Sequence, residues 1–269
     1  MNPVSWMRLC RPKNCLMAGI AAAIGYFVSA GYFLPTVQYP LVFLSVFLIC
    51  AGGQAINDYY DFEVDKRKGR AKFVESERKS VLAFSALLFL AGIAFSSLLS
   101  MQSLAIAVSF SVLLFLYSAF MQGMKFIGNY VVALGTGFSI IFGASVTGNY
   151  FLAGIFAIAA IFANLSREII KDLEDMDSDM GYKKTLPLVA GVKNAKWFAA
   201  AYAAMAILVS FVPYVALLTG KIYLLPVIVS FYFLFNSIDL TFKDKFAGAQ
   251  KNSKYAMMAA LVAFALYWA

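Results

Sequence analysis

The sequence predicts an all-α membrane protein, a polytopic bundle of nine transmembrane helices. Of its 269 residues, 62% are hydrophobic and only 13% are charged. The mean hydropathy is +0.78, a value that soluble domains do not sustain over such a length. The apolar residues form long runs, and the basic residues fall mostly in the connections between those runs. We therefore expect lipid to be the solvent of most of this chain.

Nine apolar runs are long enough to cross about 30 Å of hydrocarbon. The first four are expected at residues 15–34, 38–56, 80–99 and 103–120. The other five are expected at residues 127–146, 151–173, 196–218, 222–240 and 255–269. Arg8, Arg11 and Lys13 precede the first run, as in a signal peptide, but no convincing small-residue cleavage site followed by a polar mature chain appears. We expect the first run to be retained and residues 1–269 to form a single domain.

The basic residues predict the orientation of the bundle. With nine helices, 21 of the 22 lysine and arginine residues lie on the side of the N-terminus, and only Lys221 lies on the other side. Basic residues of short loops are retained in the cytoplasm. The sequence thus predicts a multi-pass protein of the cell membrane with a cytoplasmic N-terminus and an outer C-terminus. Nucleic acid is not an expected partner, because the net charge of +8 is spread over separate loops.

The acidic residues are gathered in two clusters. Of the fourteen, six lie within residues 58–77 and six within residues 168–179. Each cluster contains three aspartates spaced i, i+3, i+7, which places them on one face of a helix; these are Asp58, Asp61 and Asp65, and then Asp172, Asp175 and Asp179. The pattern recurs after 114 residues, at the cytoplasmic ends of the second and sixth expected helices. This recurrence predicts a repeat over residues 1–125 and 126–245, followed by a final helix.

Carboxylates so close together predict a bound cation. Like charges on one helical face repel each other, and they are unfavourable near hydrocarbon. Oxygen ligands of this kind suit Mg²⁺, whose coordination is commonly completed by substrate phosphates. Two facing clusters could hold a diphosphate through Mg²⁺, and nearby lysine and arginine residues would neutralise the remaining charge. The alternative is that both clusters are solvated helix ends.

Histidine and cysteine carry little of the chemistry. The chain contains no histidine, which excludes haem or zinc ligation by histidine and a histidine general base. The three cysteines Cys10, Cys15 and Cys50 have neither the number for a disulfide framework nor metal-ligand spacing.

The two motifs resemble those of the UbiA superfamily of intramembrane prenyltransferases. The first motif is Asn57-Asp58-x-x-Asp61-x-x-x-Asp65, and the second is Asp172-x-x-Asp175-x-x-x-Asp179. Shorter pieces of the chain are also similar, namely Arg11-Pro12-Lys13-Asn14, Tyr117-Ser118 with Lys125 and Gly128-Asn129, and Gly181 with Lys184-Thr185-Leu186-Pro187. One segment departs from the family: residues 66–80 read KRKGRAKFVESERKS and contain no proline. Arg67, Lys68, Arg70 and Arg78 therefore all remain candidates for the diphosphate contact from this loop.

The resemblance implies a bundle of nine helices around a cavity open to lipid, and Mg²⁺-dependent transfer of a polyprenyl group from its diphosphate to a lipid-soluble acceptor. It implies metal and diphosphate contacts at Asn57, Asp61, Asp175 and Asp179. The candidate catalytic residues are Asp58, Asp65, Asp172, Tyr117 and Lys125. The candidate substrate-binding residues are Lys13, Asn14, Arg70, Arg167 and Lys171.

Several of these candidates have a plainer interpretation. Tyr117 could be an interfacial anchor, and Lys125 could serve as a topology signal. Arg167 and Lys171 could pair internally with Glu168. Asp239 is left out of the candidates because it could pair with Lys243 at i+4.

Residues 167–175, which read REIIKDLED, bear on the identity of the acceptor. They are similar to the archaeal branch of the family that makes digeranylgeranylglyceryl phosphate. In that branch the acceptor is geranylgeranylglyceryl phosphate. An aromatic prenyltransferase of quinone or chlorophyll synthesis is the alternative within the family. A secondary transporter is the alternative of another class, but transporter sites lie near the bilayer midplane on broken helices, whereas these acids gather at one membrane face.

Overall fold

The structure is a computed structural model that describes residues 3–31, 36–67, 69–121, 127–181 and 184–268. Over these ranges it contains helices and no strand, which confirms the all-α fold class. The long helices are α2 (Pro12–Ala30), α3 (Gln38–Arg67), α4 (Arg78–Ser97), α5 (Met101–Leu116), α6 (Ile127–Ala144), α7 (Phe151–Glu174), α10 (Val192–Val215), α11 (Leu224–Phe242) and α12 (Phe246–Ala265). The short elements are α1 (Pro3–Cys10), α8 (Met176–Asp179), α9 (Leu186–Ala190) and the turns Glu75–Glu77, Tyr117–Met121 and Lys221–Tyr223.

Eight of the described helices are long and apolar enough to cross a membrane. The one long helix outside this group is α12, whose first half contains Gln250, Lys251, Asn252 and Lys254. The apolar run expected at residues 255–269 therefore marks only the second half of a helix that begins at Phe246. The second expected run was also too short, because α3 continues to Arg67 and its 30 residues extend about 45 Å. The first motif thus lies on the last turns of α3.

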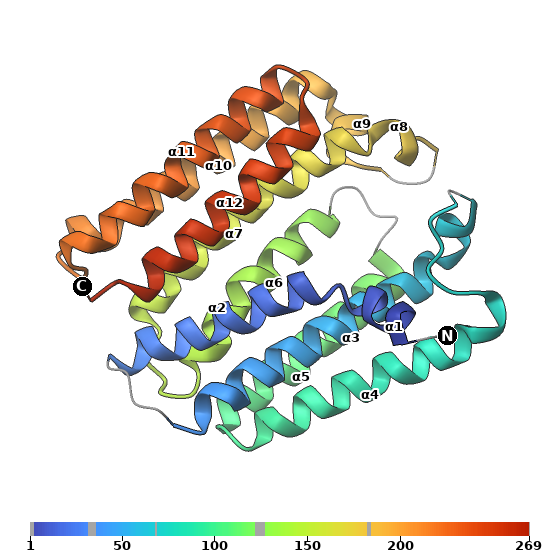
Figure 1. Ribbon diagram of the computed structural model, residues 1–269, viewed down its shortest axis with the longest axis horizontal. Helices are drawn as coiled ribbons and strands as arrows, with labels where there is room; N and C mark the ends of the chain where they lie inside the picture. The colour runs from blue at the N-terminus through green and yellow to red at the C-terminus, as the bar shows by residue number, and fades with distance from the viewer. Residues whose placement is uncertain (1–2, 32–35, 68, 122–126, 182–183, 269) are drawn as a thin grey trace.

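The long helices form two groups that lie side by side (Figure 1). One group contains α2 to α6, and the other contains α7 and α10 to α12; α6 packs against α7, and α12 packs against α7 and α2. Helix α1 and the last turns of α12 lie at opposite ends of the bundle (Figure 1). The short helices α1 and α8 lie at the end near the N-terminus, where both acidic motifs are found.

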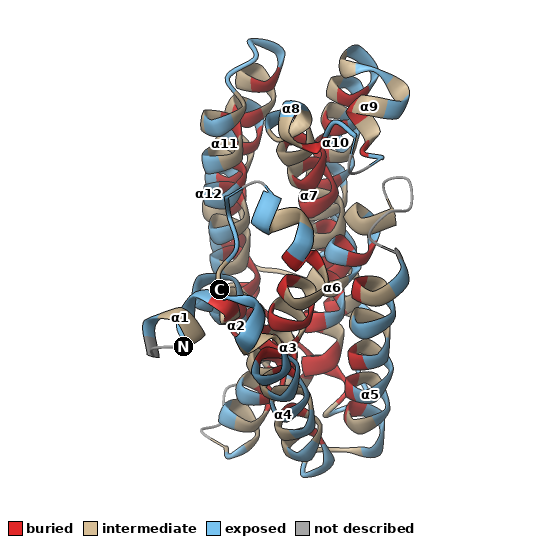
Figure 2. Ribbon diagram, turned by 90° about the vertical axis from the view of Figure 1, so that its right-hand side faces the viewer, coloured by how far each residue is buried: buried red, intermediate tan, exposed pale blue. Residues whose placement is uncertain are grey.

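The outer faces of the helices are apolar and exposed. In Figure 2 the buried positions face the interior, and α4, α5 and α11 present exposed residues outward. Large hydrophobic side chains are among them, with Leu87 63%, Leu225 65% and Phe235 75% exposed. A soluble protein rarely exposes contiguous apolar surface of this extent, so these faces are suited to contact with lipid.

Two glycines allow α2 and α6 to approach closely. A Cβ atom placed on Gly143 would lie 1.9 Å from the carbonyl oxygen of Ala22, and one placed on Gly25 would lie 2.1 Å from that of Ile140. Both obstacles are backbone atoms, which cannot rotate away. Close contact through small residues is a common way for membrane helices to associate.

We expect Gly143→Ala to destabilise the protein by about 1–3 kcal/mol, because the added methyl group forces α2 and α6 apart. The measurement is thermal unfolding in detergent. Gly154→Ala is the matched control, since a Cβ atom on Gly154 in α7 meets nothing within 4 Å. Equal stability of the two variants would contradict the close packing of α2 on α6.

The spacing of the second motif predicted a single helical face, but the helix is interrupted within the motif. Helix α7 ends at Glu174, Asp175 has φ −88° and ψ 2°, and α8 begins at Met176. Helical hydrogen bonds continue on both sides, from Asp175 N to Lys171 O and from Asp179 N to Asp175 O, each at 2.9 Å. The Ser178 hydroxyl also donates to Asp175 O. Short polar side chains that bond to nearby backbone favour such interruptions.

Candidate active site

A cavity of about 580 Å³ lies between the two helix groups. Pockets for small molecules commonly have volumes of this order. Its polar end is formed by the last turns of α3, the end of α7 and α8. The rest of its wall is largely apolar, from α2, α3, α5 and α6 on one side and from α7, α10, α11 and α12 on the other. The cavity could therefore accept a molecule with a charged head and a hydrocarbon tail.

The structure brings both motifs to the polar end of this cavity. Asn57, Asp61 and Asp65 line it from α3, and Asp172, Asp175 and Asp179 line it from α7 and α8. Within the first motif, Asn57 Nδ2 donates to Asp61 Oδ2 at 3.0 Å.

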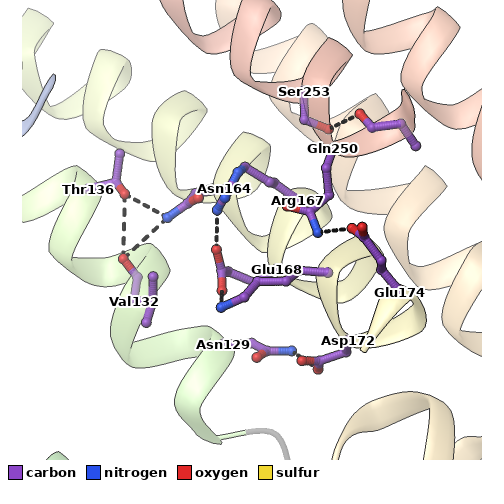
Figure 3. Close-up of polar contacts among 12 residues, drawn as sticks. Asn129, Val132, Thr136, Asn164, Arg167, Glu168, Asp172, Glu174, Gln250 and Ser253 are labelled. Atoms are coloured by element: carbon purple, nitrogen blue, oxygen red, sulfur yellow. Dashed lines mark hydrogen bonds and ion pairs between the residues drawn. The ribbon is translucent and has the colours of Figure 1, made fainter. Parts of the chain in front are cut away.

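The second motif is tied to its surroundings by two contacts. Asn129 Nδ2 on α6 donates to Asp172 Oδ2 at 2.7 Å (Figure 3). Arg70, in the segment after α3, lies 3.7 Å from Asp175, measured from Nη1 to Oδ1. Arg70 therefore connects the segment that follows the first motif to the second motif.

The carboxylate and amide oxygen atoms at this end are suited to Mg²⁺ that is completed by waters and phosphates. They are less suited to a metal ion held by protein ligands alone. In the described ranges, no three acidic, histidine or cysteine side chains converge as a preformed metal cage. Mg²⁺ is usually held by one or two carboxylates together with waters and substrate phosphates, which requires no such cage. Asp61 and Asp175 supply one carboxylate from each side of the cavity, with Asn57, Asp65 and Asp179 beside them.

Asp58 differs from the other motif aspartates because it does not line the cavity. Its side chain is only 2% exposed and accepts from Arg11 Nη2 at 2.7 Å and from Lys72 Nζ at 2.5 Å. Both cations line the cavity. The geometry makes Asp58 a positioning residue that holds Arg11 and Lys72 at the wall.

Some of the other residues predicted from sequence line the cavity, and others do not. Asn14, Arg70, Arg167 and Lys171 line the cavity, as does Tyr117. Tyr117 begins a turn with π-helical hydrogen bonding, a feature often found at functional sites. Lys13 is exposed and does not line the cavity. Lys125 and Lys68 lie outside the described residues.

Sequence analysis missed several residues of the wall. They are polar or charged residues that line the cavity, namely Arg11, Lys72, Asn129, Glu168, Lys184 and Lys254. Arg11, Asn129 and Lys184 belong to the short pieces of sequence that resemble the family, so a signal for them existed. Lys72 and Lys254 had none, because each reaches the cavity from a segment whose packing the sequence does not indicate.

The three cysteines are free thiols within the described chain, and Cys50 lines the cavity. Cys15 Sγ donates to Cys10 O at 3.0 Å. Burial, followed by the nearby Cys50 and Asp58, raises the pKa of the Cys10 thiol above its usual value. Cys10 therefore stays protonated at neutral pH and is a poor nucleophile.

Comparison with known proteins identifies the family. The model of the UbiA prenyltransferase family matches residues 18–262. Digeranylgeranylglyceryl phosphate synthase of Thermococcus kodakarensis is 37% identical over 266 residues, covering 97% of this chain and 96% of that protein. The synthase of the same name from Methanosarcina mazei is 34% identical over 282 residues, covering 97% and 96%.

Solved structures agree with this assignment. A structure reported for digeranylgeranylglyceryl phosphate synthase superposes with a TM-score of 0.79 at 29% identity, covering 98% of this chain and 97% of the other. A UbiA homologue from Archaeoglobus fulgidus, bound to DMAPP and Mg²⁺, has the same fold, with a TM-score of 0.70 at 16% identity over 97% and 99%. These matches confirm the prenyltransferase prediction over the transporter alternative. The chain belongs to the UbiA prenyltransferase family and is a multi-pass membrane enzyme that uses a polyprenyl diphosphate.

Proposed function

We propose that this enzyme transfers a geranylgeranyl group from its diphosphate to the hydroxyl of geranylgeranylglyceryl phosphate, with Mg²⁺ as cofactor. One observation carries the proposal: two acidic motifs far apart in sequence line one polar end of a cavity that continues into an apolar interior. The names of the relatives that align over nearly the whole chain support the choice of acceptor. The membrane would be the cell membrane, with α12 as a ninth span and the polar end on the cytoplasmic side.

The donor diphosphate would bind at the polar end. Asn57, Asp61, Asp175 and Asp179 would hold Mg²⁺, which when bound stabilises negative charge on the leaving diphosphate. Arg11, Arg70 and Lys72 would neutralise the charge that remains. Arg and Lys bind phosphate oxygens through charge-assisted hydrogen bonds, which are stronger than neutral ones.

The apolar wall would take the prenyl chain and exclude water from the reacting carbon. Breaking the allylic C–O bond leaves positive charge on the prenyl group, which water would capture if it entered. Tyr117 lies close to the polar end, where its ring could stabilise that charge. Asp65 and Asp172, which line the same end, are the proposed catalytic carboxylates. Lys125 stays a prediction outside the described residues.

The test is a transfer assay with purified protein in detergent micelles. Radiolabelled geranylgeranyl diphosphate and Mg²⁺ are incubated with geranylgeranylglyceryl phosphate or with an aromatic acid acceptor. We expect label in an ether lipid with the first acceptor alone. Label on the aromatic ring would favour the quinone or chlorophyll branch of the family, and no transfer to either acceptor would refute the proposal.

Removal of metal should stop this reaction. We expect EDTA to reduce transfer to background and added Mg²⁺ to restore it, because the carboxylates cannot hold a diphosphate without a cation between them. The measurement is the initial rate of product formation before and after back-titration with Mg²⁺. An undiminished rate in EDTA would contradict a metal-bound diphosphate.

A further inference from the structure

We propose that the cavity contains a second anion site, in which Arg167, Lys171 and Lys254 bind the phosphate group of the acceptor lipid. The inference rests on the proposed function and deepens it, because it assigns recognition of the acceptor to named residues. The site lies on the side of the cavity formed by α7 and α12. Arg167 and Lys171 were candidates from the sequence, and the structure adds Lys254 to them.

The three cations come together because α12 packs against α7. Arg167 and Lys171 are four residues apart on α7 and therefore lie on one face of that helix. Lys254 lies on α12, and all three side chains line the cavity. Besides its burial, the charges of Arg167, Glu168, Lys13 and Lys171 all act on Lys254.

Contacts between the helices position Lys254. Gln250, one turn before Lys254 on α12, donates a hydrogen bond to Glu174 at the end of α7 (Figure 3). The Ser253 hydroxyl is buried and bonds to Ser237 on α11 at 2.7 Å. These contacts fix the rotation of α12, so that Lys254 stays on the side of the cavity.

The cluster has an excess of positive charge. The carboxylate of Glu168 is 7% exposed and pairs with Arg167 (Figure 3). It also lies 3.7 Å from Lys171. Among the described residues, Lys254 has no acidic partner within ion-pair distance. With Asp172, the neighbour of Lys171 on α7, counted as a second carboxylate, the three cations leave a net charge of about +1. A phosphate monoester carries about −1.5 to −2 at neutral pH and would be attracted to this charge.

The cations on the α3 side of the cavity are the ones proposed above for the donor diphosphate. Arg11 and Lys72 bind the carboxylate of Asp58, and Arg70 lies beside Asp175. Arg167 is eight residues before Asp175, which is about 12 Å along the helix axis. The part of the second anion site at Arg167 is thus displaced from the place proposed for the diphosphate, whereas Lys171 lies one turn before Asp175 and is closer to it. A glycerol phosphate held there would have its phosphate at Arg167 and Lys254 and its hydroxyl toward Asp175.

The test compares Lys254→Met with Lys251→Met, a matched change of a lysine about one turn earlier on α12 that does not line the cavity. Methionine keeps the length of the side chain and removes the charge. KM and kcat are measured for the donor, for geranylgeranylglyceryl phosphate and for geranylgeranylglycerol, which lacks the phosphate. We expect Lys254→Met to raise KM for the phosphorylated acceptor about 10- to 100-fold, as loss of a charged hydrogen bond does. Lys254→Arg should restore it.

The dephosphorylated lipid makes the result specific. We expect Lys254→Met to leave KM for geranylgeranylglycerol and for the donor unchanged, and Lys251→Met to leave all three unchanged. A raised KM for the donor would assign the cluster to the diphosphate. Equal losses with both acceptors would mean that Lys254 has only a structural role. Either result overturns the site, as does an unchanged KM for the phosphorylated acceptor. If the unaltered enzyme transfers to neither lipid, the proposed function itself fails, and this site with it.

Discussion

Replacing Asp61 or Asp175 by asparagine should lower prenyl transfer by roughly a thousandfold, because metal charge stabilisation contributes several kcal/mol to the transition state. Asparagine keeps the shape of aspartate and removes its charge, so the packing of α3 and α7 should persist. The two residues come from different motifs and line the same end of the cavity. Either change alone should therefore be sufficient. The measurement is the initial rate with geranylgeranyl diphosphate at saturating Mg²⁺.

Asp239→Asn is the control for this prediction. Asp239 lies on α11, its side chain is 40% exposed, and it pairs with Lys243 at 2.7 Å, away from the cavity. We expect this variant to keep the rate of the unaltered enzyme. Retained activity in either Asp61→Asn or Asp175→Asn would show that the two motifs do not act on one diphosphate.

Asp58→Ala should destabilise the protein by about 3 kcal/mol, because removing one partner of a buried ion pair leaves the other charges uncompensated. We place the loss of stability at the lower end of the usual range, because the side chains of Arg11 and Lys72 are 38% and 25% exposed to solvent. Thermal unfolding in detergent measures it. The rate of transfer should also fall, because Arg11 and Lys72 lose the group that holds them at the cavity wall.

Glu63→Ala provides the comparison on the same helix. Glu63 is 52% exposed and lies 3.7 Å from Arg78, so its loss should change stability by only about 0–1 kcal/mol. Replacing Asp58 and Lys72 together by uncharged residues should recover part of the lost stability. If Asp58→Ala unfolds no earlier than Glu63→Ala, the buried ion pairs are not what joins α2, α3 and the segment that follows it.

Much of the site could be predicted because the charge pattern carries topological information. The spacing of the aspartates and the segregation of basic residues placed both motifs at one end of the bundle, and the structure brings them to one cavity. Spacing could not separate Asp58 from Asp61 and Asp65, since all three share a helical face. The contact that holds the Asp58 side chain away from the cavity comes from Arg11, which lies between α1 and α2.

The error at the start of α12 has a physical cause. Hydropathy locates lipid-facing segments, but the first half of α12 packs against protein through polar contacts. Asn252 and Ser253 there bond to Asn236 and Ser237 on α11. The start of the helix at Phe246 was therefore missed, and Lys254 with it. The duplication over residues 1–125 and 126–245 stays a prediction.

The central claim is that both motifs together bind a prenyl diphosphate through Mg²⁺, and a melting experiment tests it most directly. The probe is an unreactive thiolodiphosphate analogue of geranylgeranyl diphosphate, added with and without Mg²⁺. At a hundredfold excess over Kd, binding should stabilise the enzyme by about 2.7 kcal/mol. We predict a raised Tm only when analogue and Mg²⁺ are both present, and none in Asp61→Asn or Asp175→Asn. The same rise in Tm without Mg²⁺, or in either variant, would contradict the claim.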